Sequence, residues 1–410
     1  MGNVIGVDFS YTSKMLLDRV YIAVIWDSDK VSSQLEEIVA QKPFLVPFMT
    51  QLTPHRRGCQ LRLFYVLAND VETAVHFLGQ YRSIVQKVAL CGNPSTSLLT
   101  TLQSLMPDTV IYQFEHETCL RFGETLYTSQ GNVLDLKNIT GALEPTDSST
   151  LQDHLHVSVH SDVSYHIRTT NCNESRLLGS SPVGCSAVVA LFNKFLARHE
   201  TERNDLPVYL PMILDFASQG STETCDMLVS HIYGGACEHM GLPGDLVASS
   251  FGALQRLMKS RQAAQVKDLS NNHDNSHQQR PKSMTASNEK VSAEDPGYRV
   301  HCNDVNASND RMPTPLSPSQ NIPPKEDFAC SLINMLIINT TQHAALHAKA
   351  HGLKSVVFSG MVFEDVAVCS LVQNFMDYWS EGTMISHVCR NPMYIAALGA
   401  SELAISQISQ

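Results

Sequence analysis

Short apolar runs mark the beginning of the chain. Asn3–Asp8 and Tyr21–Trp26 are two such runs, and a third, Gln60–Leu67, alternates apolar and polar positions. Alternation with a period of two is typical of a strand that has one buried face. We therefore predict three successive strands in this part of the chain.

A helix–strand alternation follows these three strands. Val71–Val85 has apolar residues spaced three and four apart, which predicts an amphipathic helix. After it we predict a strand at Lys87–Leu90, a helix at Ser95–Met106 and a strand at Thr109–Phe114. The first part of the chain thus consists of three strands followed by an α/β alternation.

The second half of the chain repeats this plan. Leu155–Ile167 alternates like a pair of strands, and Arg176–Leu178 adds a further strand. The elements predicted after these strands are helices at Cys185–His199, Tyr209–Ser218, Asp327–His351, Phe363–Trp379 and Pro392–Ser406, with strands at Ser355–Phe358 and Met384–His387. Such a repeat predicts a duplicated α/β kinase-like fold, with an N-terminal lobe (1–150) and a C-terminal lobe (151–410) facing each other across a nucleotide cleft.

One segment of the C-terminal lobe lacks this patterning. From about 261 to 324 the apolar positions give way to Ser, Asn, Gln, His, Pro and Lys. A segment with so few apolar residues buries too little surface to offset the entropy of ordering. We expect it to be a disordered insertion, because the sequence on both sides is strongly patterned.

Composition excludes two broad classes of protein. The 410 residues include 29 Lys and Arg against 40 Asp and Glu, a formal net charge of -11 that argues against a nucleic-acid binder. No apolar run approaches the roughly 20 residues that a membrane span requires.

The eleven cysteines are scattered without a CxxC pair, and the N-terminus does not resemble a signal peptide. We expect a cytoplasmic protein with reduced thiols.

The stretch 232–252 carries the most specific motifs of the sequence. It contains Tyr-Gly-Gly, then Gly-Leu-Pro-Gly, then Ala-Ser-Ser-Phe-Gly, and it resembles the eukaryotic (type II-like) pantothenate kinase family. The resemblance is dense over about 210–400. Within the family, 347–353 is nearer the animal paralogue pantothenate kinase four, whose phosphatase domain we do not expect in a chain ending at Gln410. Other segments match in order and spacing: 216–221, 226–229, 325–329, 356–360 and 375–382.

This resemblance has implications for fold and activity. It implies the actin-like, ribonuclease-H-like ATPase fold of acetate and sugar kinases. It also implies ATP and Mg²⁺ as cofactors, phosphorylation of pantothenate at the head of coenzyme A synthesis, a homodimer, and acetyl-CoA or another acyl-CoA as regulator. By the same resemblance, Gly360, at the end of the matching segment 356–360, is a further cofactor-binding candidate.

The first phosphate loop of the family reads G-x-D-x-G-G-T, and here it reads Gly-Val-Asp-Phe-Ser-Tyr-Thr. Asp8 and Thr12 are kept as cofactor-binding candidates, whereas Ser10 and Tyr11 replace two glycines. Glycine lets the backbone approach a phosphate closely, and tyrosine does not. Asp8 either positions Mg²⁺ or caps a turn at the end of a strand.

The family's catalytic base is a Glu three residues before a Cys-Leu pair, and here that position is His116. Phosphoryl transfer needs a group that takes the proton of the pantothenate hydroxyl. His116 is one candidate base, and a slip of one residue makes Glu117 the other. The alternative is that catalysis is lost.

The second phosphate loop, N-x-G-S-G in the family, is Ser-Val-His-Ser-Asp over 158–162, so only Ser161 is kept for cofactor binding. Its last residue is acidic and would repel phosphate. The family's pantothenate loop corresponds to 176–186, where Arg176 and Ser181 are the substrate-binding candidates for pantothenate or acyl-CoA. The alternative for Arg176 is a surface ion pair.

Two groups of histidine and cysteine residues are candidates for a metal site. His343, His347 and His351 share one helix face, yet no carboxylate or cysteine joins them at metal spacing. A second group, Cys225, His231, Cys237 and His239, lacks a tight zinc spacing. We therefore predict no metal site from spacing. Two functions remain open: a divergent pantothenate kinase, or a pseudokinase of the same family that binds an acyl-CoA or a partner and regulates coenzyme A metabolism, the second being favoured by the altered loops.

Overall fold

The computed structural model divides the chain into two compact units: unit 1, which consists of residues 1–222 and 324–410, and unit 2, which consists of residues 223–323. Thr12, most of the predicted helix at 71–85, and the predicted insertion up to residue 321 lie outside the described residues. The structure describes residues 3–9, 19–26, 46–48, 60–67, 75–76, 78–79, 82, 85–129, 133–138, 151, 153–169, 172–199, 208–254 and 322–407.

The first sheet of unit 1 has the strand order β3-β4-β2-β1-β5-β6. β1 runs parallel to β5 and β5 to β6, whereas β2 is antiparallel to both β1 and β4. β1, β2, β4, β5 and β6 confirm the predicted strands, and β3 was not predicted. Their bounds are Asn3–Asp8 (β1), Arg19–Trp26 (β2), Val46–Phe48 (β3), Gln60–Leu67 (β4), Val85–Cys91 (β5) and Val110–Phe114 (β6).

The second sheet of unit 1 repeats this topology with the order β10-β9-β8-β13-β14-β7. β8, β13 and β14 are parallel neighbours, β9 is antiparallel to both β8 and β10, and β7 is an additional antiparallel edge strand beside β14. The strands are Val133–Asp135 (β7), His154–Val159 (β8), Val163–Thr169 (β9), Cys172–Ser181 (β10), Ser355–Gly360 (β13) and Ile385–Cys389 (β14). Apart from the edge strands β3 and β7, the two sheets have the same order of five strands, which confirms the predicted duplicated, ribonuclease-H-like α/β fold.

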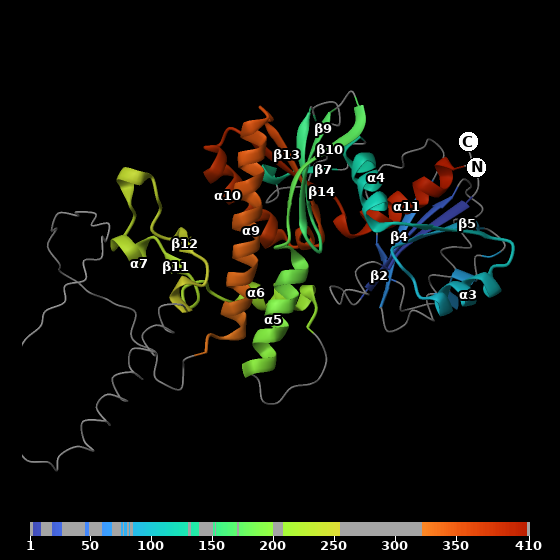
Figure 1. Ribbon diagram of the computed structural model, residues 1–410, viewed down its shortest axis with the longest axis horizontal. Coiled ribbons are helices and arrows are strands. Elements are labelled where there is room, and N and C mark those ends of the chain that lie inside the picture. The colour runs from blue at the N-terminus through green and yellow to red at the C-terminus, as the bar shows by residue number, and fades with distance from the viewer. Residues whose placement is uncertain are drawn as a thin grey trace, which may run out of the picture. The chain divides into compact units, whose positions relative to one another are not determined.

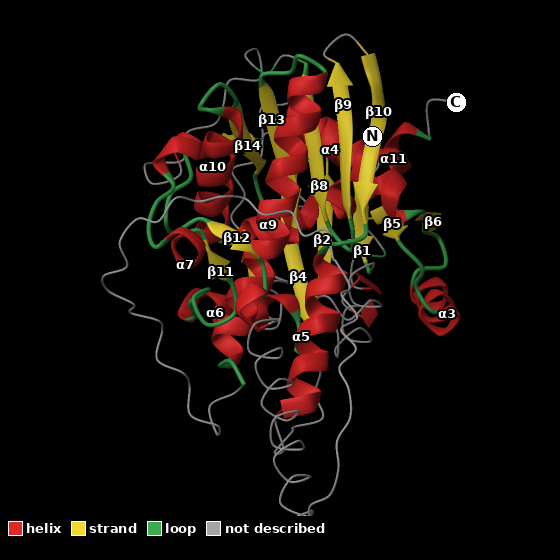
Figure 2. Cartoon of the chain, turned by 60° about the vertical axis from the view of Figure 1, so that its left-hand side comes forward, coloured by secondary structure: helices red, strands yellow, loops and turns green. Residues whose placement is uncertain are grey.

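Helices connect and cover these strands (Figure 1). In Figure 2, α9 runs along the faces of β8 and β13, where its buried face includes Leu332 and Leu336. The helix α4 was not predicted, although the others were. The helices are Thr96–Leu105 (α3), His116–Ser129 (α4), Cys185–His199 (α5), Leu210–Gln219 (α6), Lys325–Ala350 (α9), Val366–Ser380 (α10) and Ile395–Ser406 (α11), and short 3-10 turns are Leu136–Asn138, Met361–Glu364 and Pro392–Tyr394.

The helix α11 packs closely on β1 and on α4 because glycines remove the side chains at the contacts. A Cβ on Gly6 of β1 would lie 2.0 Å from the carbonyl oxygen of Ala397. A Cβ on Gly123 of α4 would lie 2.1 Å from the carbonyl oxygen of Ile395. The helix α11 is thereby held against the first sheet and against α4.

Unit 2 contains the stretch that carries the family motifs. It forms β11 (Met227–Leu228), α7 (Ser230–Tyr233), a 3-10 turn (Glu238–Met240) and β12 (Val247–Ser249). The carboxylate of Asp226, which is fully buried, accepts a hydrogen bond of 2.7 Å from the N–H of Phe251. This bond fixes the residues that follow β12 against those that precede β11.

Two further properties of the described residues bear on the sequence predictions. Among them, no helix combines the length and the apolar character that crossing a membrane requires. The cysteines whose pairing the structure describes are free thiols, as predicted: Cys91, Cys119, Cys185, Cys225, Cys237, Cys330, Cys369 and Cys389.

Candidate functional site

The carboxyl ends of three parallel neighbours, β1, β5 and β6, meet at one edge of the first sheet. Asp8 is the last residue of β1 and pairs directly with Cys91, the last residue of β5, which in turn pairs with Phe114 of β6. The N–H of Phe9 donates to the carbonyl of Cys91 over 3.2 Å, and the N–H of Gly92 donates to the carbonyl of Phe114 over 3.1 Å. The backbone is therefore fixed at the point where functional side chains leave the strands.

Asp8, Cys91 and His116 form a cluster at this edge, which we call the strand-end cluster. One carboxylate, sulfur or ring-nitrogen atom from each residue lies within 4.8 Å of those of the other two. Asp8 and Cys91 are buried, and His116, the first residue of α4, is partly buried. The structure thus brings together two of the predicted site residues, Asp8 and His116, and adds Cys91, which the sequence analysis missed.

The turn between β8 and β9, residues 160–162, contributes a second histidine to this region. The rings of His116 and His160 meet edge to face, with centroids 6.0 Å apart and planes at 86°. His160 is buried, and it is the residue that the motif resemblance pairs with the first glycine of the family's second phosphate loop. Its imidazole lies beside His116, in space that a glycine would leave open.

The N-terminus of α5 is joined to the same turn. The N–H groups of Cys185 and Ser186 donate to the carbonyls of His160 and Ser161 over 2.8 and 3.1 Å. A Cβ on Gly184 would lie 2.5 Å from the Cα of Asp162, so this contact needs a glycine. Unpaired N–H groups at the start of a helix bind anions. Here the two N–H groups already donate to protein carbonyls, so they are not available to a phosphate.

The remaining predicted residues lie in several places. Glu117 is exposed on α4, outside the strand-end cluster. Ser181 ends β10 beside the 160–162 turn, and its hydroxyl accepts a hydrogen bond of 3.2 Å from the N–H of Val183. Arg176 is exposed on β10, five residues before Ser181, which at about 3.3 Å per residue separates the two by roughly 17 Å.

Gly360 ends β13 next to Val159, the last residue of β8. Its φ of 129° lies in a region that favours glycine, and a Cβ would lie 1.9 Å from the carbonyl oxygen of Val159. Close contact of the two strand ends is therefore a physical reason for glycine at this position.

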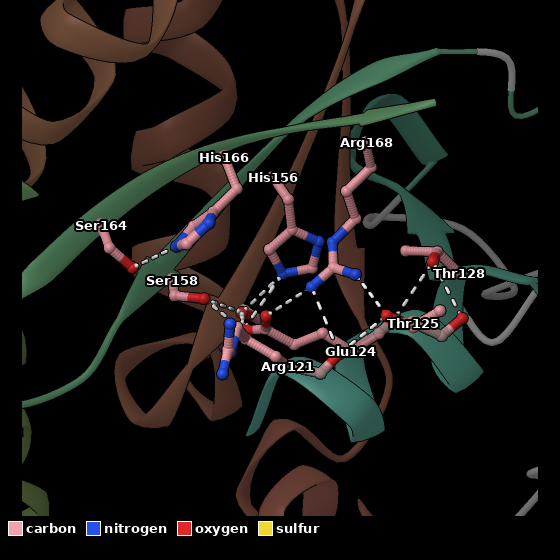
Figure 3. A network of polar contacts seen from close by, with 10 residues as sticks. Arg121, Glu124, Thr125, Thr128, His156, Ser158, Ser164, His166 and Arg168 are labelled. Atoms are coloured by element: carbon pink, nitrogen blue, oxygen red, sulfur yellow. Dashed lines mark hydrogen bonds and ion pairs between the residues drawn. The ribbon is translucent and has the colours of Figure 1, made fainter. Parts of the chain in front are cut away.

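A buried ionic network centred on Glu124 lies between α4 and the second sheet (Figure 3). Oε2 of Glu124 lies 2.9 Å from the Arg168 guanidinium, and Oε1 accepts hydrogen bonds from Ser158 and, over 2.8 Å, from Ser359. Nε2 of His156 lies 3.3 Å from the same Oε1. The network ties α4 to β8, β9 and β13, and none of its members was predicted as a functional residue.

The network sets the ionisation of its members. Burial raises the pKa of Glu124, but the His156 ring, the Arg168 guanidinium and the Ser158 hydroxyl together hold that pKa well below its usual range. Burial lowers the pKa of His156, more than the Glu124 carboxylate raises it. Glu124 is therefore ionised and His156 neutral at pH 7, which makes Arg168 the charge that balances the carboxylate.

The duplicated sheets define the fold class of this chain, which is the actin-like ATPase fold of acetate and sugar kinases. Residues 124–402, more than half of the chain, match the Fumble family, which is the pantothenate kinase family. The chain belongs to this family, and the resemblance described from its motifs is confirmed.

A search among curated proteins gives a more particular relative. The chain is 28% identical over 189 residues to the 4'-phosphopantetheine phosphatase of Mus musculus, the relative that corresponds to the predicted paralogue. The match covers 46% of this chain but 16% of the length of that protein. The chain is therefore related to one region of a much longer relative.

Solved structures of sugar kinases are also similar to this chain at low identity. A ROK family glucokinase from Streptomyces griseus, in complex with glucose and AMPPNP, is 10% identical with a TM-score of 0.39, covering 99% of this chain and 100% of its own. A glucokinase from Balamuthia mandrillaris is 10% identical with a TM-score of 0.38, covering 98% of this chain and 94% of its own.

Proposed function

We propose that this chain is a pseudokinase of the pantothenate kinase family, which binds a pantothenate-containing molecule such as an acyl-CoA and does not phosphorylate pantothenate at an ordinary rate. The observation that carries this proposal is the contact between His116 and His160, whose ring centroids are 6.0 Å apart. One ring replaces the carboxylate of the family's base, and the other fills a glycine position of its phosphate loop.

The chemistry of the site argues in the same direction. In-line phosphoryl transfer depends on positioning and on donors aimed at developing charge. Here the N–H groups of Cys185 and Ser186 already donate to protein carbonyls. The carboxylate of Asp162, in the place of the loop's second glycine, adds negative charge where a phosphate would approach.

The family implies ATP and Mg²⁺ as cofactors, and the residues present fit them poorly. Mg²⁺ prefers an octahedral set of oxygen ligands. In the strand-end cluster Asp8 offers oxygen, but its two neighbours offer the sulfur of Cys91 and a ring nitrogen of His116. We therefore derive no catalytic step through ATP·Mg²⁺ in this chain.

A second candidate function, a divergent kinase, is favoured by one specific observation. A carboxylate oxygen of Asp8 lies within 4.8 Å of a ring nitrogen of His116. A carboxylate beside an imidazole orients the ring and stabilises its protonated form, which is how a histidine becomes a general base. In this alternative, His116 would take the proton of the substrate hydroxyl.

Formation of phosphopantothenate from radiolabelled pantothenate, with saturating ATP·Mg²⁺, distinguishes the two functions. If the chain is a pseudokinase, we expect no product above background. Turnover on the order of 1 per second would instead establish the divergent kinase. Calorimetric titration with acetyl-CoA and with pantothenate tests the binding function separately. Binding of neither ligand would contradict the proposed role in coenzyme A metabolism.

Assembly and location complete the proposal. We expect a homodimer in the cytoplasm, as the family resemblance implies. Light scattering of the purified chain at micromolar concentration tests the first point, and a monomer mass across that range would refute it.

A further inference from the structure

We propose that Asp8, Cys91 and His116 bind a transition-metal ion, of which Zn²⁺ is the best fit. This inference goes beyond the proposed function and holds whether or not the chain phosphorylates pantothenate. It starts from the types of donor that the fold gathers in one place: a carboxylate oxygen, a sulfur and an imidazole nitrogen, all within 4.8 Å of one another.

The positions of the donors suit a metal centre. Zinc–ligand bonds of about 2.0–2.3 Å place tetrahedral donors roughly 3.3–3.8 Å apart. The donors of the strand-end cluster, at most 4.8 Å apart, therefore need to close by about 1.5 Å at most to reach this geometry.

The sheet holds two of the three ligands in register. Asp8 and Cys91 are direct partners in the parallel ladder between β1 and β5, so their side chains leave the same face of the sheet. His116 follows β6, the next parallel strand, and begins α4. Ligands carried by rigid elements keep a metal geometry better than ligands on loops.

The donor set also selects the ion. Thiolate and imidazole ligands favour zinc and its neighbours over Mg²⁺ and Ca²⁺, which prefer oxygen. One carboxylate, one thiolate and a neutral imidazole balance the charge of a divalent ion. Such a neutral complex suits this site, where Asp8 and Cys91 are 1% and 0% exposed.

Three protein ligands leave one tetrahedral position for water or another ligand, as in zinc sites that are not purely structural. His116 is the partly exposed member of the cluster, so we place the open position on its side. The edge-on ring of His160 adjoins His116 there, and we treat it as a neighbour of the site and not as a fourth ligand.

The test uses the full chain, stripped of metal with a chelator and titrated with Zn²⁺ and with Co²⁺. We expect one ion per chain. We also expect a near-ultraviolet charge-transfer band of a cobalt–thiolate bond, together with the intense visible bands of tetrahedral cobalt. Zn²⁺ should raise Tm of the chain.

Variants assign the ligands. Cys91→Ser should abolish the charge-transfer band, and Asp8→Asn and His116→Gln should each weaken Zn²⁺ binding by at least about tenfold. Matched controls are Cys330→Ser and His343→Gln on α9, which should leave binding and spectrum unchanged. Circular dichroism verifies that each variant is folded.

Three results would overturn the proposal. The first is a wild-type chain that binds no Zn²⁺ or gives Co²⁺ bands without a thiolate component, which needs no variant. The second is binding that survives both Asp8→Asn and His116→Gln. The third is loss of binding in His343→Gln, which would assign the metal to the histidine face of α9.

Discussion

Oε2 of Glu124 lies 2.9 Å from Nη2 of Arg168, with both side chains buried in unit 1. The pair joins α4, which follows the first sheet in the chain, to β9 in the second sheet. The hydroxyls of Ser158 and Ser359 complete the hydrogen bonds of the carboxylate. A buried ion of this kind is tolerated only while all its partners are present.

Glu124→Gln should therefore destabilise the chain strongly. The substitution leaves the guanidinium of Arg168 buried without its balancing charge, and breaking a buried pair in this way costs about 3–5 kcal/mol. Urea unfolding followed by circular dichroism gives the free energy of unfolding. The matched control is Glu117→Gln on the exposed face of the same helix, which should change that energy by about 0.5 kcal/mol or less.

If Glu124→Gln lowers the free energy of unfolding by less than about 1 kcal/mol, this account is contradicted, because exposed ion pairs contribute energies in that range. A double variant, Glu124→Gln with Arg168→Met, refines the test. Because it removes both charges, it should be less destabilised than Glu124→Gln alone.

The stability of the chain should fall as the pH drops below about 6.5, the ordinary pKa of histidine. Burial lowers the pKa of His156, so the unfolded chain binds a proton that the folded chain resists. The contribution of His156 to stability is therefore fully present above the unfolded pKa, and it is lost at up to about 1.4 kcal/mol per pH unit between the unfolded and the folded pKa. Glu124, whose folded pKa is also lowered, adds a further loss below about pH 4.3.

Unfolding curves at pH 7.5, 6.5 and 5.5 measure this slope. His156→Gln should make this slope smaller between pH 6.5 and 5.5, since the neutral amide still donates to Glu124 and does not titrate. The slope that remains comes from His166 and His387, whose pKa values burial also lowers. An unchanged slope in His156→Gln would show that another group is responsible.

Gly360→Ala should destabilise the fold by more than about 2 kcal/mol. The new methyl group would lie 1.9 Å from the carbonyl oxygen of Val159, and the φ of 129° is strained for any other residue. Gly235→Ala is the matched control because nothing lies within 4 Å of its Cβ position. Equal Tm changes for the two variants would contradict the close contact between β8 and β13.

Most of the fold was predictable because each half repeats a simple pattern. The apolar run in β1, the alternating residues in β4 and the helical periodicity in α3 and α5 carry their own signals. The helix α4 was missed although Cys119, Leu120, Leu126 and Tyr127 give it a buried stripe. Glu124 and Gly123 interrupt that stripe, since a buried carboxylate and a close contact with α11 override local propensity.

The candidate site was only partly predictable for a related reason. Asp8 and His116 were found through their positions in family motifs, whereas Cys91 had no motif and became visible only from the register of β1 with β5. The network around Glu124 joins residues up to 235 positions apart in the chain. Such pairings depend on tertiary contacts that a pattern of apolar residues does not encode.

Restoring the family's base should not restore kinase activity. His116→Glu supplies the carboxylate, but the ring of His160 and the charge of Asp162 remain at the phosphate loop. Each lost donor to developing charge costs about a hundredfold or more in rate. Adding His160→Gly and Asp162→Gly, with Ser10→Gly and Tyr11→Gly in the first loop, should recover ATP binding before it recovers turnover.

The measurement is phosphopantothenate formation from radiolabelled pantothenate, with ATP affinity determined in parallel on each variant. A well-placed base increases the rate by a factor of about 10²–10⁴, but it has no effect while the phosphates of ATP have no binding site. The wild-type chain and His116→Glu should thus both stay at background, and the loop variants should bind ATP measurably. If His116→Glu alone restores turnover, the loops are competent and the substituted base alone explains the lost activity. If the wild-type chain turns over at an ordinary rate, the Asp8–His116 pair acts as the base and the divergent kinase is correct.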